Sequence, residues 1–319
     1  MCARASILLV SSILGGSLSG RSIAQAQDCK LQILPPHAEV GGRPLGDWGA
    51  AWWQWVLNVP KDRNPITDTT GEFAHEGQAG DVFFLGGNFG GKSDRQVTIP
   101  CGKRLFFPFL NVVGWVPADC VDCDGCRTVV RQYMDGATLI ECEIDGAAVE
   151  NLGDHREESV CFPLTVPPEN VFGLPPGVFE PAIADGFYLM LEPLCPGKHT
   201  LHFRGRIGPA ADPTFELEVT YDLTVEACGA FRRGDANSDG GLNLSDAVFL
   251  LDGLFRGGSP AACHDAADMN DDGALNLTDA VYVLDYLFRG GTAPPPPGPA
   301  GCKEDPTLDE LPGCTVACN

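Results

Sequence analysis

Two twelve-residue segments near the end of the chain, residues 235–246 (DANSDGGLNLSD) and 268–279 (DMNDDGALNLTD), carry oxygen-bearing side chains in the same order. Positions 1, 3 and 5 are Asp, Asn and Asp, position 6 is glycine, position 9 is Asn and position 12 is Asp. Because glycine lacks Cβ, it permits a sharp turn that gathers these oxygens around one point. The pattern predicts a loop for a hard cation that accepts about six to eight oxygen ligands, namely calcium.

Zinc does not fit these loops, since it would require Cys or His in place of the oxygens. A surface turn rich in Asp, Asn and Gly is the alternative, and two segments in one register disfavour it. We therefore predict two calcium ions, each held by side chains at positions 1, 3, 5, 9 and 12 and by the backbone carbonyl at position 7. The predicted ligands are Asp235, Asn237, Asp239, Gly241, Asn243 and Asp246 in the first loop, and Asp268, Asn270, Asp272, Ala274, Asn276 and Asp279 in the second.

The similarity continues beyond the loops at the same offset of 33 residues, which identifies a tandem duplication. After each loop, apolar residues recur at the spacing of an amphipathic helix that ends at Gly-Gly. These residues are Val248, Leu251 and Phe255 in the first repeat, and Val281, Leu284 and Phe288 in the second. Glycine and proline precede each loop, so each repeat is a loop with an exiting helix and lacks the entering helix of an EF-hand.

Residues 231–291 resemble the dockerin type I domain of secreted, often polysaccharide-degrading bacterial proteins. The two calcium repeats and the Asp at position 12 carry this resemblance. It implies a small α-helical module, residues 229–291, that docks on a cohesin module of a partner protein. It also implies that positions 10 and 11 contact the partner: Leu244, Ser245, Leu277 and Thr278. Leucine at position 10 departs from the small polar residue that is usual in the family.

The first 26 residues have the form of a signal peptide: a basic start at Arg4, an apolar run, and Ala24-Gln25-Ala26 before the expected cleavage site. A membrane anchor is the alternative, but the run is short and Gly15-Gly16 interrupts it, so we expect no membrane span. We predict a secreted, extracellular bacterial protein.

The 14 cysteines support that compartment, because disulfides persist outside the cell. Removal of Cys2 with the signal leaves an odd number, so at least one thiol is unpaired or intermolecular. The cluster at Cys120, Cys123 and Cys126 lacks a nearby fourth zinc ligand, which favours disulfides over a metal site. The net charge of -22 leaves no basic patch for phosphates, so we expect no nucleic acid partner.

Residues 27–228 are long enough for one core, and their pattern predicts a mainly β domain with one N-terminal helix. The helix is expected from Asp47, as N-cap, to about Pro60, with its tryptophans in the core. The clearest strand is 215–226, where apolar and polar residues alternate, and Asp145-Gly146 predicts a hairpin. Further strands are expected at 82–85, 96–99, 104–110, 160–166, 187–191 and 199–207. Short strands without helical crossovers predict an antiparallel β-sandwich, of plain or jelly-roll type, and residues 167–185 predict a long ordered loop.

Three groups in this domain have a chemical interpretation, and each has a structural one that we favour. Residues 86–93 match a phosphate-loop pattern, but the chain continues as a strand and not as the required helix. His199 and His202 lie three apart on a strand and so face opposite sides, which excludes a shared metal. Residues 154–158 (DHREE) include Glu157 and Glu158, candidate carboxylates of a glycosidase, but a solvated turn is the favoured interpretation.

Residues 292–319 form a tail in which Pro294–Pro297 predicts a stiff extended spacer. Its three cysteines favour a segment pinned by disulfides, and a disordered end is the alternative. The whole chain is therefore interpreted as a secreted calcium-binding protein. Its dockerin-like module mediates docking, either on a cohesin-type partner or within the chain, and displays a β-sandwich binding domain for which carbohydrate is a candidate ligand. The alternative is an extracellular glycoside hydrolase in polysaccharide catabolism, carried on a dockerin.

Overall fold

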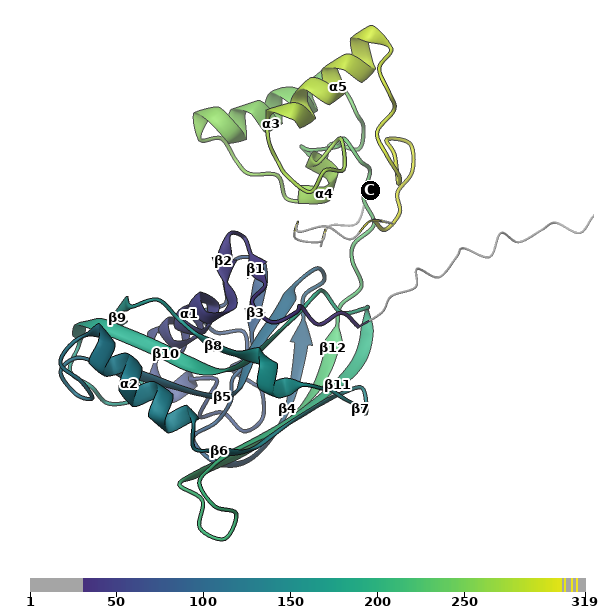
Figure 1. Cartoon of the computed structure of the whole chain (residues 1–319). Coiled ribbons are helices and arrows are strands. Elements are labelled where there is room, and N and C mark those ends of the chain that lie inside the picture. The colour runs from purple at the N-terminus through teal and green to yellow at the C-terminus, as the bar shows by residue number, and fades with distance from the viewer. Residues whose placement is uncertain (1–30, 306, 308–310, 312–313, 315–319) are drawn as a thin grey trace, which may run out of the picture.

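The computed structural model describes residues 31–305, 307, 311 and 314, so the predicted signal peptide lies outside the described residues. The described chain is mainly β, with two five-stranded sheets stacked face to face and a helical region at the C-terminal end (Figure 1). The first sheet contains β3 (Val82–Phe84), β5 (Arg104–Trp115), β8 (Arg156–Glu158), β9 (Phe162–Val166) and β10 (Gly177–Leu191). The second contains β4 (Gly91–Ile99), β6 (Ala137–Ile144), β7 (Ala147–Ala148), β11 (Gly197–Ile207) and β12 (Phe215–Val225).

The core between the two sheets follows from the period-two pattern of the strands. On β12, the residues from Leu217 to Val225 are buried at every second position, as the alternation predicts. Aromatic rings join the two sheets: Phe107 of β5 stacks on Phe203 of β11, with ring centroids 5.5 Å apart. This core contains most of the large apolar side chains of the second sheet.

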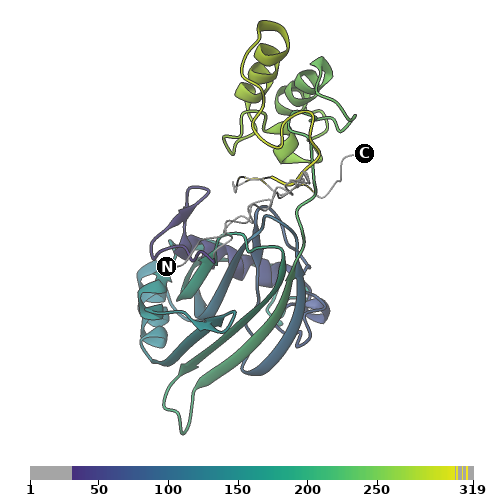
Figure 2. The ribbon, with the colours of Figure 1, turned by 90° about the vertical axis from the view of Figure 1, so that its right-hand side faces the viewer.

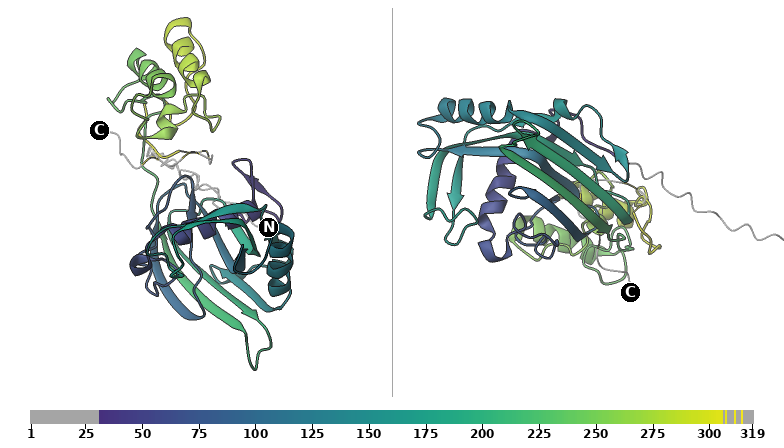
Figure 3. Two further views of the ribbon diagram at one scale, coloured as in Figure 1. Left: turned by 90° about the vertical axis from the view of Figure 1, so that its left-hand side faces the viewer. Right: turned by 90° about the horizontal axis from the view of Figure 1, so that it is seen from below.

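The other face of the first sheet is covered by helix α1 (Leu45–Asn58), whose tryptophans supply a second core (Figure 3). The predicted helix is confirmed, but its N-cap is Pro44, three residues earlier than the expected Asp47. Asp47 is therefore in the first turn and is not the N-cap. Its Oδ1 accepts a hydrogen bond from the backbone amide of Val160, 2.9 Å away, which fastens the helix to the chain before β9. A short hairpin, β1 (Glu39–Val40) with β2 (Arg43–Pro44), precedes the helix.

The prediction of a purely antiparallel sandwich without helical crossovers is wrong in two respects. Strands β4 and β12 pair in parallel, and so do β3 and β5. A helix that the sequence interpretation missed, α2 (Cys123–Met134), connects β5 to β6. Asp122 caps it by accepting a hydrogen bond from the Gly125 amide, and Cys126, Val130 and Met134 form its one buried stripe.

The predicted loop at residues 167–185 is also wrong in its second half, because β10 begins at Gly177. Pro181 cannot donate to a ladder, and the register between β9 and β10 shifts between Phe179 and Ala182. The irregularity therefore accommodates the proline. Only residues 167–176 remain as a connection.

The C-terminal region consists of two matching helices, α3 (Leu244–Arg256) and α5 (Leu277–Arg289), packed side by side, with the short α4 (His264–Ala267) beneath them (Figure 2). Both long helices end where predicted, at Gly257 and Gly290, which have φ of 74° and 71°. The residues that pack the helices together differ from the predicted apolar stripe. They are Ala247 and Leu250 on α3, and Ala280 and Val283 on α5. Much of the predicted stripe faces outward, since Val248 is 56% exposed and Phe255 is 66% exposed.

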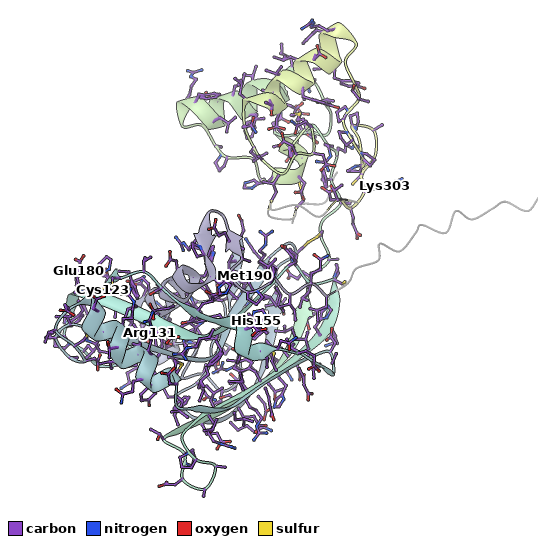
Figure 4. The ribbon with its side chains drawn as sticks, in the orientation of Figure 1. Cys123, Arg131, His155, Glu180, Met190 and Lys303 are labelled. Carbon is purple, nitrogen blue, oxygen red and sulfur yellow. A yellow bond between two sulfur atoms is a disulfide. The ribbon has the colours of Figure 1, made fainter. Side chains whose placement is uncertain are left out.

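The tail is pinned by a disulfide, as predicted, between Cys263 and Cys314. The prolines do not form an extended spacer, however, because the chain turns there: the Gly298 amide donates to the carbonyl of Pro295. Lys303 then pairs with Phe231, at the start of the helical region (Figure 4).

Other disulfides join Cys101 to Cys228, Cys120 to Cys126, and Cys123 to Cys161, which agrees with the prediction for the cysteine cluster. Among the described cysteines, Cys142 is free and buried. Among the described helices, none combines the length and apolar character needed to cross a membrane.

Candidate metal centre

Each twelve-residue loop is organised by the same backbone hydrogen bonds. The carboxylate at position 1 accepts from the amide of position 6, the amide oxygen at position 3 accepts from position 5, and the carboxylate at position 5 accepts from position 7. The bonds in the first loop run from Gly240 to Asp235 (2.9 Å), Asp239 to Asn237 (2.9 Å) and Gly241 to Asp239 (3.2 Å). Those in the second run from Gly273 to Asp268 (2.8 Å), Asp272 to Asn270 (3.1 Å) and Ala274 to Asp272 (3.1 Å). The two loops therefore share the same hydrogen-bond geometry as well as the same sequence pattern.

Position 12 joins each loop to its helix. Asn243 and Asn276 are the N-caps of α3 and α5, and the carboxylates of Asp246 and Asp279 accept from their backbone amides at 2.8 and 2.9 Å. These reciprocal capping boxes fix where the helices begin. The conformation of each loop and the start of the following helix thus depend on the same aspartate.

The position-12 carboxylates are fully buried among other negative charges. Burial, together with the charges of Asp239 and Asp235, raises the pKa of Asp246 to about 6. Burial and the charge of Asp268 likewise raise the pKa of Asp279 to about 6. Such carboxylates favour a counter-charge, which a divalent cation supplies.

One oxygen of the first loop supports the same interpretation. Asp235 Oδ1 is buried and has no hydrogen-bond partner, whereas Oδ2 of that carboxylate is bonded to Gly240. A buried carboxylate oxygen without a donor is costly unless a cation satisfies it. Among the described residues, no group of three or more His, Cys, Asp and Glu side chains is gathered for a metal. The predicted ligands of each loop also include amide and backbone oxygens. The residues present fit calcium, whose charge would offset that of the loop aspartates.

The residues that the resemblance assigns to a partner lie at the first turns of the two helices. Leu244 and Leu277 are each 50% exposed. Ser245 and Thr278 are exposed as well, but their hydroxyls are engaged with the loops: Asn237 Nδ2 donates to Ser245 Oγ, and Asn270 Nδ2 donates to Thr278 Oγ1. Position 10 is therefore free to contact a partner, while position 11 also supports the loop.

Further apolar side chains extend this surface along both helices. We call the set the outer apolar face; it comprises Leu244, Val248, Phe255, Leu277, Val281 and Phe288, each at least half exposed. A depression of about 370 Å³ lies along α5 and is lined by Leu277, Val281 and Tyr282 among others. Because the two halves of the face repeat at 33 residues, α3 and α5 present nearly the same chemistry.

Arg233 holds the tail against the second loop and was missed by the sequence interpretation. Its guanidinium is fully buried and donates to the carbonyl of Asp268, at position 1 of that loop (2.8 Å). It also donates to the carbonyl of Pro296 and to the carboxylate of Asp305 in the tail. A single arginine beside a glycine gave no sequence signal, because its partners are about 30 to 70 residues away.

The sequence at residues 86–93, which matches the phosphate-loop pattern, is held in place by a buried arginine. As predicted, it continues into strand β4. The carbonyls of Gly86 and Gly87 accept hydrogen bonds from the guanidinium of Arg95, which is 2% exposed and also donates to the Asp68 carbonyl and the Tyr221 hydroxyl. The carbonyl groups of this loop therefore bind the guanidinium of Arg95, which holds the loop in place.

The two remaining groups lie as follows. His199 shares the inward face of β11 with Leu201, and His202 faces the other side, as predicted; His199 Nδ1 lies 2.8 Å from Asp145 Oδ2. The predicted solvated turn at residues 154–158 is wrong, because residues 156–158 form β8, half-buried against β10.

Arginine side chains pair with the carboxylates in and around β8. Glu158 accepts from Arg127 and Arg131 of α2, each at 2.6 Å, and Arg156 donates to Asp185 at 2.7 Å. Figure 4 shows Arg131 and His155 on the side of the sandwich that α2 covers. Strong pairing of these groups gives them a structural role.

Comparison with known proteins adds little. No family model matches the chain, and no curated protein matches it. Among solved structures, the cysteine protease inhibitor EhICP2 from Entamoeba histolytica is similar over 46% of this chain and 95% of its own, with 12% identity and a TM-score of 0.19. Amebosin is similar over 42% of this chain and 96% of its own, with 10% identity and a TM-score of 0.16. TM-scores this low support no conclusion about the fold or function of this chain.

Proposed function

We propose that the chain is a secreted calcium-binding protein whose residues 229–291 form a dockerin-type docking module. The observation that carries the proposal is the recurrence of one loop geometry at both twelve-residue segments, each with a buried aspartate at position 12. Calcium in both loops fixes the starts of α3 and α5. The outer apolar face is then held rigidly enough to dock on a cohesin-type module of a partner protein.

The exposed surface supports this proposal. Apolar side chains that gather in one patch on a soluble protein usually mark an interaction site. Here they gather on the two helices that the loops orient, and the ion pairs Arg256–Asp252 and Arg289–Asp285 flank the patch in both repeats. The β-sandwich is then the part that the module carries and displays.

The calcium half of the proposal predicts two ions per chain in titration calorimetry of the mature protein. Asp246→Asn and Asp279→Asn should each remove one ion, because each removes a charged ligand and loosens one capping box. Asp252→Asn, at a half-buried aspartate of α3 outside the loops, is the matched control and should leave both ions bound. Failure of the wild-type protein to take up calcium would refute the proposal.

The docking half predicts that an immobilised type I cohesin module retains the mature protein in calcium and releases it in chelator. The double variant Val248→Asp with Val281→Asp should lose this binding by roughly tenfold or more, while it keeps both ions. Val178→Asp alters a valine that is 61% exposed on the sandwich, and it should bind normally. If the protein takes up calcium but binds none of several cohesins, the calcium site is supported and a cohesin partner is refuted. Docking of the module within its own chain would then remain as the proposed interaction.

A further inference from the structure

A pocket of about 300 Å³ opens at one end of the sandwich, beside α1. Its walls are rich in aromatic side chains and include Trp52 and Trp53 of α1, Trp115 of β5, Phe172, and Phe215 of β12. Together with Gly87 in the loop before β4, these residues come from five separate segments of the chain. The pocket therefore forms only when the chain is folded. Its size is at the lower end of the range for small-molecule sites.

The topology of the first sheet explains why space remains there. Strand β5 has 12 residues, but its neighbour β3 has only 3 and pairs with Arg104, Leu105 and Phe106 alone. Beyond Phe106, that edge of β5 has no strand beside it among the described residues. Loop side chains cover it instead: Phe89 lies against Phe172, with ring centroids 5.6 Å apart.

Two buried side-chain donors among the lining residues, Trp53 Nε1 and Asn111 Nδ2, have no hydrogen-bond acceptor. The indole N–H groups of Trp48, Trp52 and Trp55 all donate to backbone carbonyls, at 3.2, 2.9 and 2.8 Å. Trp53 is only 7% exposed, yet its Nε1 is buried and has no acceptor. Buried tryptophans usually have a partner for this group, so the missing acceptor of Trp53 points to a ligand.

The lining also limits what can bind. Among the described residues that line the pocket, none is Asp, Glu, Lys, Arg or His. A charged molecule would lose its hydration without compensation there, and a molecule with many hydroxyls would leave most of them unpaired. Flat apolar rings suit walls of Trp and Phe.

We propose that this pocket binds a small, uncharged, ring-containing molecule that offers a carbonyl-type oxygen to the N–H of Trp53. The site is separate from the calcium loops, and it does not depend on the proposed docking function. It gives the sandwich a ligand of its own.

The test uses prodan, an uncharged naphthalene ketone whose emission shifts to the blue in apolar surroundings, with the mature full-length protein. We expect one saturable site and energy transfer from the pocket tryptophans. Gly87→Phe should abolish binding, because a Cβ at Gly87 meets no atom within 4 Å and the added ring can fill the pocket. Gly153→Phe is the matched control, since a Cβ there is equally unobstructed, and it should bind normally.

Trp53→Phe provides a second and milder variant, which keeps an aromatic ring and removes the N–H donor. It should weaken prodan roughly tenfold and leave naphthalene, which lacks the ketone, nearly unchanged. Circular dichroism confirms that each variant is folded. The proposal is overturned if wild-type protein binds no prodan, if folded Gly87→Phe protein binds it as well as Gly153→Phe protein, or if Trp53→Phe weakens both probes equally.

Discussion

His155 shows how a single side chain can make stability depend on pH. It lies at the end of the 3-10 helix η2 (Leu152–His155), is 7% exposed, and its Nδ1 has no hydrogen-bond partner. Burial lowers the pKa of His155 below its ordinary value of 6.5, although the charges of Asp154 and Glu157 act in the opposite direction. The folded state therefore favours the neutral ring.

The consequence for stability follows from proton linkage. Above pH 6.5 the ring is neutral in both states, and the folded state bears no penalty. As pH falls below that value, the unfolded chain takes up a proton that the folded chain resists, so the free energy of unfolding decreases. Denaturant unfolding of calcium-loaded His155→Phe protein should show a weaker decrease between pH 7 and pH 5 than wild type. His75→Phe, at an exposed histidine, is the matched control. Identical slopes for wild type and His155→Phe would contradict the prediction.

At the same scale, the turns of the two loops were predictable from the sequence, because each loop is a local turn whose contacts lie within twelve residues. The role of their side chains as calcium ligands stays a prediction. Arg95 and Arg233 were missed for the opposite reason. Their partners come from distant segments, and a buried arginine looks like a surface residue in a sequence.

Among the elements, the loop at residues 86–91 depends on the guanidinium of Arg95. Arg95→Met would remove a donor from the carbonyls of Asp68, Gly86 and Gly87, of which only Gly86 keeps another, the Tyr221 hydroxyl. We expect a loss of about 3 kcal/mol in the free energy of unfolding, because several buried acceptors lose their partner together. Thermal and urea unfolding measure this directly. Arg63→Met is the control: Arg63 pairs with Glu76 at the surface, and its change should cost less than about 1 kcal/mol.

Elements with strong periodicity were predictable, and those with mixed signals were not. Strand β12 and helices α3 and α5 were predicted nearly to their ends. Strand β10 was predicted only from Phe187, because Pro181 and the glycines near it indicate a loop unless β5 and β9 are known to lie alongside. Helix α2 was obscured by its glycine and cysteines, although the spacing of Cys126, Val130 and Met134 was a usable signal.

For the whole molecule, the disulfide between Cys101 and Cys228 joins the connection between β4 and β5 to the residues after β12. It closes a loop of 127 residues and ties together the ends of the parallel neighbours β4 and β12. Its replacement by Cys101→Ala with Cys228→Ala should cost about 4 kcal/mol of unfolding free energy, mainly through the unfolded chain. The pair Cys120→Ala and Cys126→Ala, whose residues are 6 apart, should cost about half as much. Equal losses in chemical denaturation would show that loop length is not the cause.

The sheet order was beyond the reach of the sequence. Strands β4 and β12 are more than 100 residues apart and run parallel, and nothing in either strand specifies its neighbour. The pocket was unpredictable for the same reason, since it exists only where β3 ends short of β5.

Cys142 bears on how the chain keeps its final set of cross-links. Burial, with a smaller effect of the charge of Glu143, raises the pKa of its thiol to about 12. Thiol exchange requires the thiolate, so once β6 is in place this sulfur cannot attack the neighbouring bonds. Burial inside the sandwich therefore keeps the one free thiol among the described cysteines out of exchange with the disulfides of the folded protein.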